Sequence, residues 1–561
     1  MTVAAALFIG QTELPLNGTQ PGELAEVPEP SSRCGCHFNF VRDEVVEPGQ
    51  TYAPTAMALS ARDPLFLAAL EVAHRDEPRL SPTCLRCHAP AGWLAGRSLP
   101  GDGSSLLTED LEGVTCDICH RMIRPAEGTH IGDGQYTLAD DEFKRGGRGS
   151  SPQSGHRVMQ SDYTRSSEVC GVCHSLFNPL EDAHDPDGNK LGFNYYEQRT
   201  YEEWRDSAVA QQKSCIDCHM RRISGASCRE RLNTYDDLAH HGIVGGNTFA
   251  PRAVALLYPE LELGDEVAVL REWVAENLAN AATLEIRSDH DTPASVQAGD
   301  RLDVSVRLTN KTGHKLPTGY PEGRRVFLQV ELHVEGREST MISGDWNPRT
   351  GDIVEDDQLR TYETAHGRVG EGRTQHLALA NQILDDTRIP PEGFRPQAAD
   401  MIPQGRDYGS PPYRHYDDYT YSVPMPTDVQ STLTGTITIR AMHQTTSGKY
   451  VRFLLDEIGT DGPAGMNLQR AFAVLGRAPP EKMVEVSLPI LVTERVDPPD
   501  SGVLMDARDA VTADAGEAVT PSPAGCGCQS APRHSRSGAT PWWFAGLGLL
   551  LGVRCVRRFR G

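Results

Sequence analysis

The stretch Cys84-Leu-Arg-Cys87-His88 is the first of four sequences that share one spacing of two cysteines and a histidine. In each of them two residues separate the cysteines, and a histidine follows the second cysteine directly. The other three are Cys116-Asp-Ile-Cys119-His120, Cys170-Gly-Val-Cys173-His174 and Cys215-Ile-Asp-Cys218-His219. Four copies of one pattern in a single part of the chain do not arise by chance, so this part is built around what the pattern binds.

The spacing is that of covalent haem attachment. Two thiols add to the two vinyl groups of a haem, and the adjacent histidine then ligates the iron. Paired cysteines are also typical of structural zinc sites, but zinc does not require a histidine directly after every second cysteine. We therefore predict four c-type haems, with His88, His120, His174 and His219 as proximal ligands. Because c-type haem is attached outside the cytoplasmic membrane, the motifs also predict an extracytoplasmic protein.

A fifth stretch, Arg33-Cys34-Gly35-Cys36-His37, departs from the pattern because only one residue separates its cysteines. Ten of the 14 cysteines lie between Cys34 and Cys218, whereas residues 281–496 contain none. A disulfide framework distributes cysteines through the domain that it cross-links. The clustering of cysteines in one part of the chain therefore indicates a cofactor-binding region. It leaves open a fifth haem at residues 34–37.

Residues 31–250 resemble the multihaem cytochrome c family that includes cytochrome c554-like domains. The stretches that carry the resemblance include ARDPLFLAAL (61–70), CLRCHAPAGWLAGRS (84–98), GVTCDICHR (113–121) and SCIDCHM (214–220). Such cytochromes have their first haem site at the place of residues 33–37, just before the ARDP element. The resemblance implies that Cys36 and His37 bind a haem there. Arg33 then stands at the first-thiol position, and Cys34 is either strained into a second bond or unattached.

The resemblance also implies distal ligands. His156 lies in a stretch similar to the ligand-bearing segment of such cytochromes, and His241 in HHGIVGGN matches their histidine before GGN, with His240 as its competitor. Met57 precedes the ARDP element, where family members carry a methionine, and core packing is its alternative role. His314 lies in a loop similar to the GHKLPTG segment of β-domains that follow such haem domains; it either ligates a haem across the domain interface or hydrogen-bonds locally. We expect packing or surface roles for the remaining histidines of the region: His74, His130 and His184.

Residues 31–280 are predicted to form short helices between long loops, with little β-pattern. Asp63-Pro64 is a helix start, since aspartate caps the first amides and proline is tolerated at the first helical position. Further helices are expected over 201–212 and 265–279. Haem is a large apolar plate, so several haems replace much of the side-chain core and make a loop-rich region stable.

In the second half of the chain, apolar and polar residues alternate with a different period. Apolar residues alternate with polar ones over 302–308, and runs at 326–334, 437–441 and 484–492 repeat this period of two. Strands separated by Gly- and Pro-rich loops predict an antiparallel β-sandwich. The predicted fold class is α + β and multidomain: a loop-rich, mainly helical multihaem domain, then an antiparallel β-sandwich-like domain, then a C-terminal anchor helix.

The C-terminal residues predict a linker and an anchor. The sequence after residue 497 is too poor in large apolar groups to fold. It leads to Cys526-Gly-Cys528, the apolar run PWWFAGLGLLLGV and an Arg-rich end. Thirteen apolar residues are short for a span that needs about 20. The arrangement resembles the MYXO-CTERM sorting signal, which implies processing and lipid attachment at the two cysteines and display at the cell surface. A plain tail anchor is the alternative.

The first ten residues are apolar but have no basic start and no clear cleavage site, so they indicate either a shortened signal or a wrongly assigned start. The predicted segments are a lead-in (1–30), the multihaem domain (31–280), the β-sandwich-like domain (281–496), a disordered linker with the Cys-Gly-Cys motif (497–540) and a sorting helix with an Arg-rich end (541–561).

The composition excludes some function classes. A net charge of −23 argues against a nucleic-acid partner, because phosphate binding needs clustered Lys and Arg, and 38% apolar residues exclude a polytopic membrane protein. The leading hypothesis is an electron carrier that serves unidentified redox partner proteins and is held at the membrane by its C-terminus. The alternative is a multihaem oxidoreductase acting on a small nitrogen or sulfur compound, which needs an open iron position and acid–base groups. A pure display protein leaves the four motifs unexplained.

Overall fold

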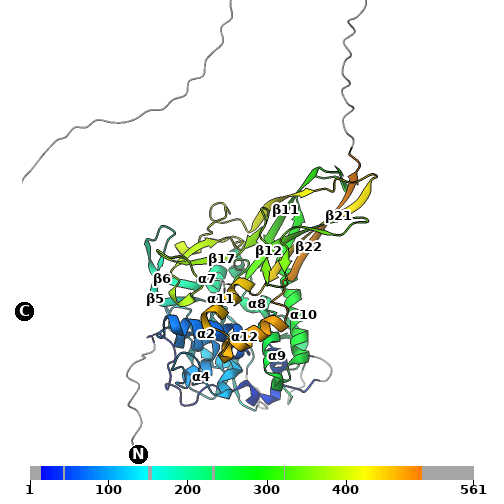
Figure 1. Cartoon of the computed structure of the whole chain (residues 1–561). Helices are drawn as coiled ribbons and strands as arrows, with labels where there is room; N and C mark the ends of the chain where they lie inside the picture. Colours follow the sequence, from blue (N-terminus) through cyan, green and yellow to red (C-terminus); the bar gives the residue numbers. More distant parts are fainter. Residues whose placement is uncertain are drawn as a thin grey trace, which may run out of the picture. The chain divides into compact units, whose positions relative to one another are not determined.

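The structure, a computed structural model, describes residues 14, 16–41, 45–149, 155–229, 234–320 and 323–495. These residues form helices and several separate sheets, which confirms the α + β class (Figure 1). The predicted linker and anchor helix, residues 497–561, lie outside the described residues. Within the described ranges, no helix is both long and apolar enough to cross a membrane. The lead-in, described from residue 16 onward, contains no helix or strand up to residue 30.

The helices agree in part with the sequence prediction. Asp63 caps α2 by accepting a hydrogen bond from the Leu65 amide at 2.9 Å, and the helix expected over 265–279 is α10. The helix expected over 201–212 is confirmed only up to Arg205, because the backbone at Ser207 is extended and its hydroxyl donates to the Trp204 carbonyl. The α-helices are α1 (Pro48–Tyr52), α2 (Pro64–Asp76), α3 (Ser81–His88), α4 (Pro90–Leu94), α5 (Cys116–Arg121), α6 (Glu168–Gly171), α7 (Thr200–Arg205), α8 (Cys215–His219), α9 (Ala250–Leu257), α10 (Gly264–Asn280), α11 (Gly448–Ile458) and α12 (Pro463–Val474).

Strands occur in both halves of the described chain, so the expectation of little β-structure before residue 250 is wrong. The longest strands there, β5 and β6, form an antiparallel hairpin whose register shifts several times, and this hides the period of two. The strands are β1 (Met122–Ile123), β2 (Thr137–Leu138), β3 (Phe143–Gly146), β4 (Arg157–Gln160), β5 (Leu176–His184), β6 (Lys190–Gln198), β7 (Arg222–Gly225), β8 (Tyr235–Ala239), β9 (Ala282–Ile286), β10 (Ala294–Gln297), β11 (Arg301–Asn310), β12 (Arg325–Val334), β13 (Thr340–Ser343), β14 (Trp346–Asn347), β15 (Asp352–Ile353), β16 (Thr361–Tyr362), β17 (Thr364–Arg368), β18 (Gly372–Arg373), β19 (Gln382–Asp386), β20 (Tyr416–Pro424), β21 (Leu433–Gln444) and β22 (Glu481–Thr493).

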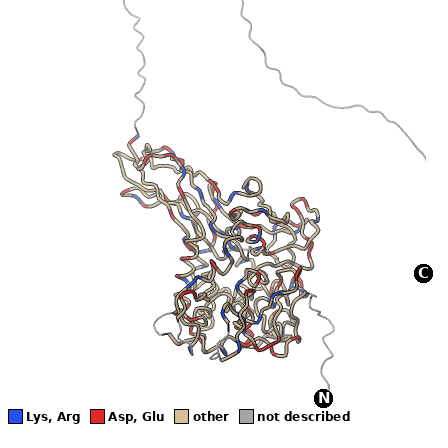
Figure 2. Tube along the Cα trace, turned by 180° about the vertical axis from the view of Figure 1, so that it is seen from behind, with Lys and Arg blue, Asp and Glu red and all other residues tan. Residues whose placement is uncertain are grey.

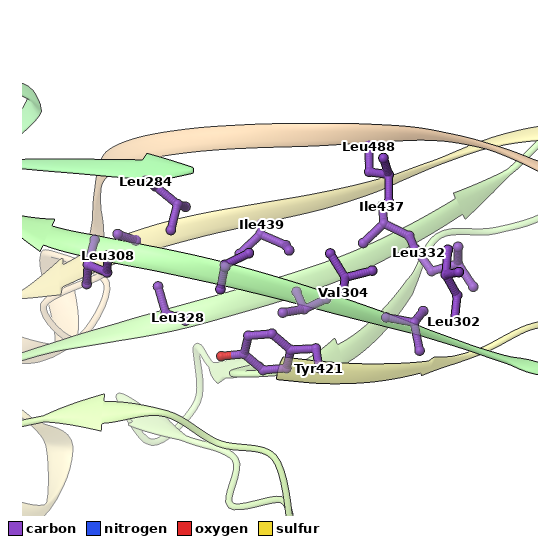
Figure 3. Packing of buried hydrophobic residues seen from close by; sticks show 14 of the residues in the cluster. Leu284, Leu302, Val304, Leu308, Leu328, Leu332, Tyr421, Ile437, Ile439 and Leu488 are labelled. Atoms are coloured by element: carbon purple, nitrogen blue, oxygen red, sulfur yellow. The ribbon is translucent and has the colours of Figure 1, made fainter. Parts of the chain in front are cut away.

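The four alternating runs of the second half lie in β11, β12, β21 and β22. One sheet has the order β10-β22-β21-β12-β13 and another the order β20-β11-β9. Both contribute to one buried cluster, in which Val304 and Tyr421 of the smaller sheet lie against Leu328 and Ile439 of the larger (Figure 3). Two sheets that pack face to face share a core in this way. One pair departs from the antiparallel prediction, because β10 runs parallel to β22.

Two helices inserted between β21 and β22 were not predicted. Ser447 caps α11, whose Val451 and Leu454 pack with Leu468 of α12 onto Val72 of α2. Figure 1 shows α2 and α12 side by side. A further sheet, β18-β17-β19-β5-β6, also joins strands from both halves. Packing therefore crosses the predicted boundary at residue 280, and the boundary itself stays a prediction.

Acidic and basic residues are interspersed along the described chain (Figure 2). Several of them form ion pairs, and one pair, Lys315 with Asp386, is fully buried. Nucleic-acid binding needs Lys and Arg gathered on one face. The expectation that the protein has no nucleic-acid partner stays a prediction.

Candidate haem-binding site

Each regular motif lies on a short helix or helical turn. Cys84–His88 end α3, Cys116–His120 form most of α5, and Cys215–His219 are the whole of α8. Cys170 lies in α6, and the His174 amide donates to the Cys170 carbonyl at 3.0 Å. Residues four apart share one face of an α-helix. The first cysteine and the histidine of each motif therefore lie on the same side, as one cofactor bound by both requires.

The thiols of the four regular motifs are not joined in disulfide bonds. Apolar clusters around the motifs are small: one packs Cys119 and Cys173 against Ile118 and Trp93, and another packs Cys84 against Leu85. In the described part of the chain, no three His, Cys, Asp or Glu side chains converge on a point, as a zinc ion held by protein ligands alone requires. The donors are instead arranged as thiol pairs beside histidines.

Three of the five motif histidines face a second histidine at nearly equal separation. Two imidazoles on opposite sides of one metal ion have ring centres about 6.2 Å apart, from about 2.0 Å per metal–nitrogen bond and roughly 1.1 Å from nitrogen to ring centre. The facing pairs and the distances between their ring centres are His37 with His156 (6.2 Å), His120 with His241 (6.3 Å) and His219 with His314 (6.4 Å). Each of the three predicted distal histidines therefore lies opposite a motif histidine, and its role as a ligand stays a prediction.

Backbone carbonyls fix the orientation of the paired imidazoles. Nδ1 of His120 lies 2.5 Å from the Arg145 carbonyl, and Nδ1 of His219 lies 2.6 Å from the Val244 carbonyl. On the distal side, Nδ1 of His241 lies 2.9 Å from a carbonyl. An N–H at Nδ1 leaves the lone pair on Nε2, which is the ligating tautomer.

Burial favours the neutral form of His120, His241 and His314. It lowers the pKa of His241 to about 3 and that of His314 to about 4, and it lowers the pKa of His120 as well. A neutral ring is the form that can bind a metal. Two thiols, a proximal imidazole and a facing imidazole together fit haem c.

His88 and His174 have other surroundings, since no second imidazole of the described residues faces either of them. The Phe66 ring stacks on His88, with centres 3.7 Å apart. The Gln198 side-chain amide lies 3.2 Å from Nδ1 of His174. Met57 packs in the apolar cluster of Cys119, and its role as a ligand stays a prediction.

The other histidines of the region bond elsewhere. His74 lies 2.9 Å from the Ser81 hydroxyl, and His130 pairs with Asp133 at 3.0 Å. His184 lies 3.4 Å from a backbone carbonyl. These contacts agree with the packing and surface roles expected for them.

Thiols from different motifs lie next to one another. Three pairs are close enough to influence each other's ionisation: Cys34 and Cys116, Cys87 and Cys173, and Cys170 and Cys215. Cys119 is also close enough to Cys170 and Cys173 for their charges to interact. The five motifs therefore form one connected group.

Arg86, between the two cysteines of the first motif, is a structural anchor of the site. It is 1% exposed, its guanidinium lies 4.4 Å from the centre of the Trp93 ring, and Nη2 donates to the Asn17 carbonyl. We expect Arg86→Ala to lower the free energy of unfolding by about 2–4 kcal/mol, because a buried cation–π contact and a charged hydrogen bond are lost. Arg79→Ala, at an exposed residue between α2 and α3, should cause no measurable change in the free energy of unfolding. Urea denaturation of both variants checks this, and equal midpoints would contradict it.

A buried ionic cluster behind His314 was not predicted. Lys315 Nζ lies 2.5 Å from Asp386, Arg388 bonds Asp386 at 2.7 Å, and Glu203 accepts from the Lys315 amide at 3.1 Å. These residues lie on three distant segments, so no local pattern marks them. A cavity of about 20 Å³, lined in part by Glu203, Lys315 and Arg388, lies beside them.

Two other residues that line this cavity also escaped the sequence analysis. Nδ1 of His366 contacts the Tyr195 hydroxyl, and its Nε2 is buried with no partner among the described residues. Burial raises the pKa of Glu197 to about 7. Both residues belong to the unpredicted sheet that joins β17 to β6.

No protein-family model matches the sequence, and no curated protein matches it either. Among solved structures, the chain is similar to a penta-haem cytochrome c552 from Thermochromatium tepidum, with 17% identity over 83% of this chain and 100% of that chain and a TM-score of 0.48. It is also similar to Spo0M, a sporulation control protein from Bacillus subtilis, with 8% identity over 38% of this chain and 49% of that chain and a TM-score of 0.12. At these TM-scores neither similarity decides the fold or the function, which rest on the residues of this chain.

Proposed function

We propose that the chain is a multihaem c-type cytochrome that transfers electrons through at least four covalently bound haems, with residues 34–37 as the candidate site of a fifth. The observation that carries the proposal is the set of three facing histidine pairs at the separation of two imidazoles on one metal ion. Haem with two axial protein ligands mostly passes electrons, whereas haem with an open position binds and converts small molecules. Bound haem supplies the one-electron chemistry, and the protein supplies ligation, orientation and burial.

Contacts between motifs support transfer along a chain of sites. Each thiol would hold the edge of a haem, so neighbouring thiols of two motifs would bring the two attachment points together. The contacts join the motif of Cys34 to that of Cys116, and the motif of Cys170 to that of Cys215. A third contact ties the motif of Cys87 to this group. Electrons that enter at one motif can therefore pass to the others within one protein.

The β-rich half takes part in the site. His314 comes from the loop between β11 and β12 and faces His219 of α8. The amide of the next residue, Lys315, is held by Glu203 of α7. We infer that the second half of the chain completes one haem site and does not merely cover it.

The proposal extends to location and partners. Covalent c-type haem implies a protein outside the cytoplasmic membrane, in the periplasm or at the cell surface. Cys526 and Cys528, with the apolar run that follows, would anchor it there through the MYXO-CTERM-type signal. Its partners would be redox proteins that donate and accept single electrons.

A catalytic role on a small nitrogen or sulfur compound is the second candidate. It is favoured by His88 and His174, which no second imidazole of the described part faces. Gln198, next to His174, also lines the polar cavity that includes His366 and Arg388. Such a site offers cationic and acid–base groups near a haem with an open position.

Haem counting and carbon monoxide binding test the proposal. Intact mass and a pyridine haemochrome assay on exported protein should show at least four covalent haems. In the reduced protein, the irons of the three facing pairs should stay low-spin and bind no carbon monoxide, because both axial positions are taken. Protein without covalent haem would reject the proposal. Carbon monoxide or nitrite binding confined to one iron would favour the catalytic candidate, and binding at most of the irons would contradict electron transfer as the main role.

A further inference from the structure

We propose that Cys34-Gly-Cys36-His37 is a haem attachment site that forms both thioether bonds, with Cys34 as the first thiol and Cys36 as the second. This rests on the proposed function, because it takes the four regular motifs to bind haem. The sequence placed Arg33 at the first-thiol position and left two alternatives for Cys34, a second bond or no bond; the structure favours the bond. The Arg33 side chain is 70% exposed and lies 3.6 Å from Glu29, so it is a surface residue.

A change of helix type compensates for the missing residue. In a regular motif, the His174 amide donates to the Cys170 carbonyl four residues earlier. At the short motif, the His37 amide donates to the Cys34 carbonyl three residues earlier, at 2.9 Å, and Gly35–His37 form a 3-10 turn.

The two windings span the same height. Four residues of α-helix rise about 6.0 Å and turn about 400°. Three residues of 3-10 helix also rise about 6.0 Å and turn about 360°. Cys34 and His37 are therefore separated along and around the helix axis much as Cys170 and His174 are. A motif shorter by one residue can present its first thiol and its histidine to the same cofactor.

A regular motif shows how a first cysteine contacts its neighbour. The Ser167 hydroxyl, three residues before Cys170, accepts a hydrogen bond from the Cys215 amide at 3.1 Å. The Cys170 thiol is also close enough to the Cys215 thiol for the two to influence each other's ionisation. Cys170 and Cys215 are both the first cysteines of their motifs, so this is a contact between first thiols.

Cys34 repeats that contact residue for residue. The Ser31 hydroxyl, three residues before Cys34, accepts a hydrogen bond from the Cys116 amide, again at 3.1 Å. The Cys34 thiol is also close enough to the Cys116 thiol for the two to influence each other's ionisation. Because Cys116 is the first cysteine of its motif, Cys34 occupies the place that Cys170 holds as a first thiol.

The remaining parts of the site are also present. His37 faces His156 at 6.2 Å between ring centres, and Nδ1 of His37 lies 2.6 Å from the Ser227 carbonyl. The proximal ring is thus oriented as in the regular motifs. Each thioether forms by addition: the S–H bond and the vinyl double bond give one C–S and one C–H bond, and no oxidant or reductant is consumed.

Peptide mapping of the exported full-length protein tests the proposal. We expect five haems by intact mass. The tryptic peptide 34–42 should carry one haem and take up no iodoacetamide after denaturation, because both thiols are blocked. Cys34→Ser should keep five haems but shift the haemochrome band to the red, since one vinyl group stays unsaturated. Cys34→Ser/Cys36→Ser should hold four. Cys228→Ser, whose neighbours in the chain contact residues 36 and 37, is the control and should match the wild type.

Three results would overturn the proposal: four haems in the wild type, one iodoacetamide label on a haem-bearing peptide 34–42, or an unshifted band in Cys34→Ser. The peptide measurement needs no variant, so misfolding of a mutant cannot obscure it. Haem on the four regular peptides alone rejects this inference and leaves the proposed function intact. Absence of haem from the regular peptides rejects the proposed function itself.

Discussion

Replacing His241 with alanine is expected to leave one haem iron five-coordinate, so roughly one iron in five becomes high-spin and binds carbon monoxide when reduced. The reason is geometric: His241 faces His120 at 6.3 Å between ring centres, and its Nδ1 is held 2.9 Å from the Ala239 carbonyl. No other described imidazole faces His120 at this separation. The change is measured from the electronic spectrum and from carbon monoxide titration. Added free imidazole should restore the low-spin spectrum, because it replaces the missing ligand without repairing any structural defect.

The neighbouring histidine provides a matched control. His240 is 4% exposed, packs edge-on against Trp273 at 4.2 Å, and accepts a hydrogen bond from the Gly242 amide. We expect His240→Ala to lower stability, because a buried aromatic contact is lost, but to leave the high-spin fraction as in the wild type. A high-spin signal in His240→Ala and none in His241→Ala would reverse the assignment of the ligand.

The haem motifs were predictable because their chemistry lies within five consecutive residues. A thiol pair and its histidine need only helical spacing, which local sequence provides. The distal histidines were predictable only as candidates, from resemblance. Which of them faces which motif, such as His314 with His219, depends on contacts between distant segments that no local pattern contains. The same holds for Lys315 and Asp386, which meet only when the chain is folded.

The elements of the fold likewise fall into those that the sequence predicted and those that it missed. The strands β11, β12, β21 and β22 have one buried face and one polar face, so their period of two is visible in the sequence. Helices α11 and α12 lie between two such strands and were missed, because the surrounding β-pattern set the expectation. The hairpin β5–β6 was missed because its bulges interrupt the alternation. Regular burial leaves a signal in the sequence, and irregular burial does not.

Asp386→Asn is expected to lower the free energy of unfolding by about 3–5 kcal/mol, because it leaves the buried Lys315 without a carboxylate partner and Arg388 with Glu203 alone. Asp386 is fully buried and bonds both Lys315, at 2.5 Å, and Arg388, at 2.7 Å. Burial alone raises the pKa of Asp386, but the charges of Arg388 and Lys315 outweigh it and hold the pKa below its ordinary value. Urea denaturation at pH 7 measures the loss.

The pH dependence of this loss has a definite sign. A depressed pKa contributes stability that is fully present above the ordinary value of the carboxyl, about 3.9, and is lost as pH falls toward the folded value. The gap between wild type and Asp386→Asn should therefore be constant near neutrality and shrink below about pH 4. Asp385→Asn, an exposed neighbour, should show no measurable gap at any pH. A gap that widens in acid would show that Asp386 is protonated in the native state.

Because Lys315 directly follows His314, a disturbed cluster should also raise the high-spin fraction at the haem of His219, which ties the stability of the β-rich half to ligation in the haem region.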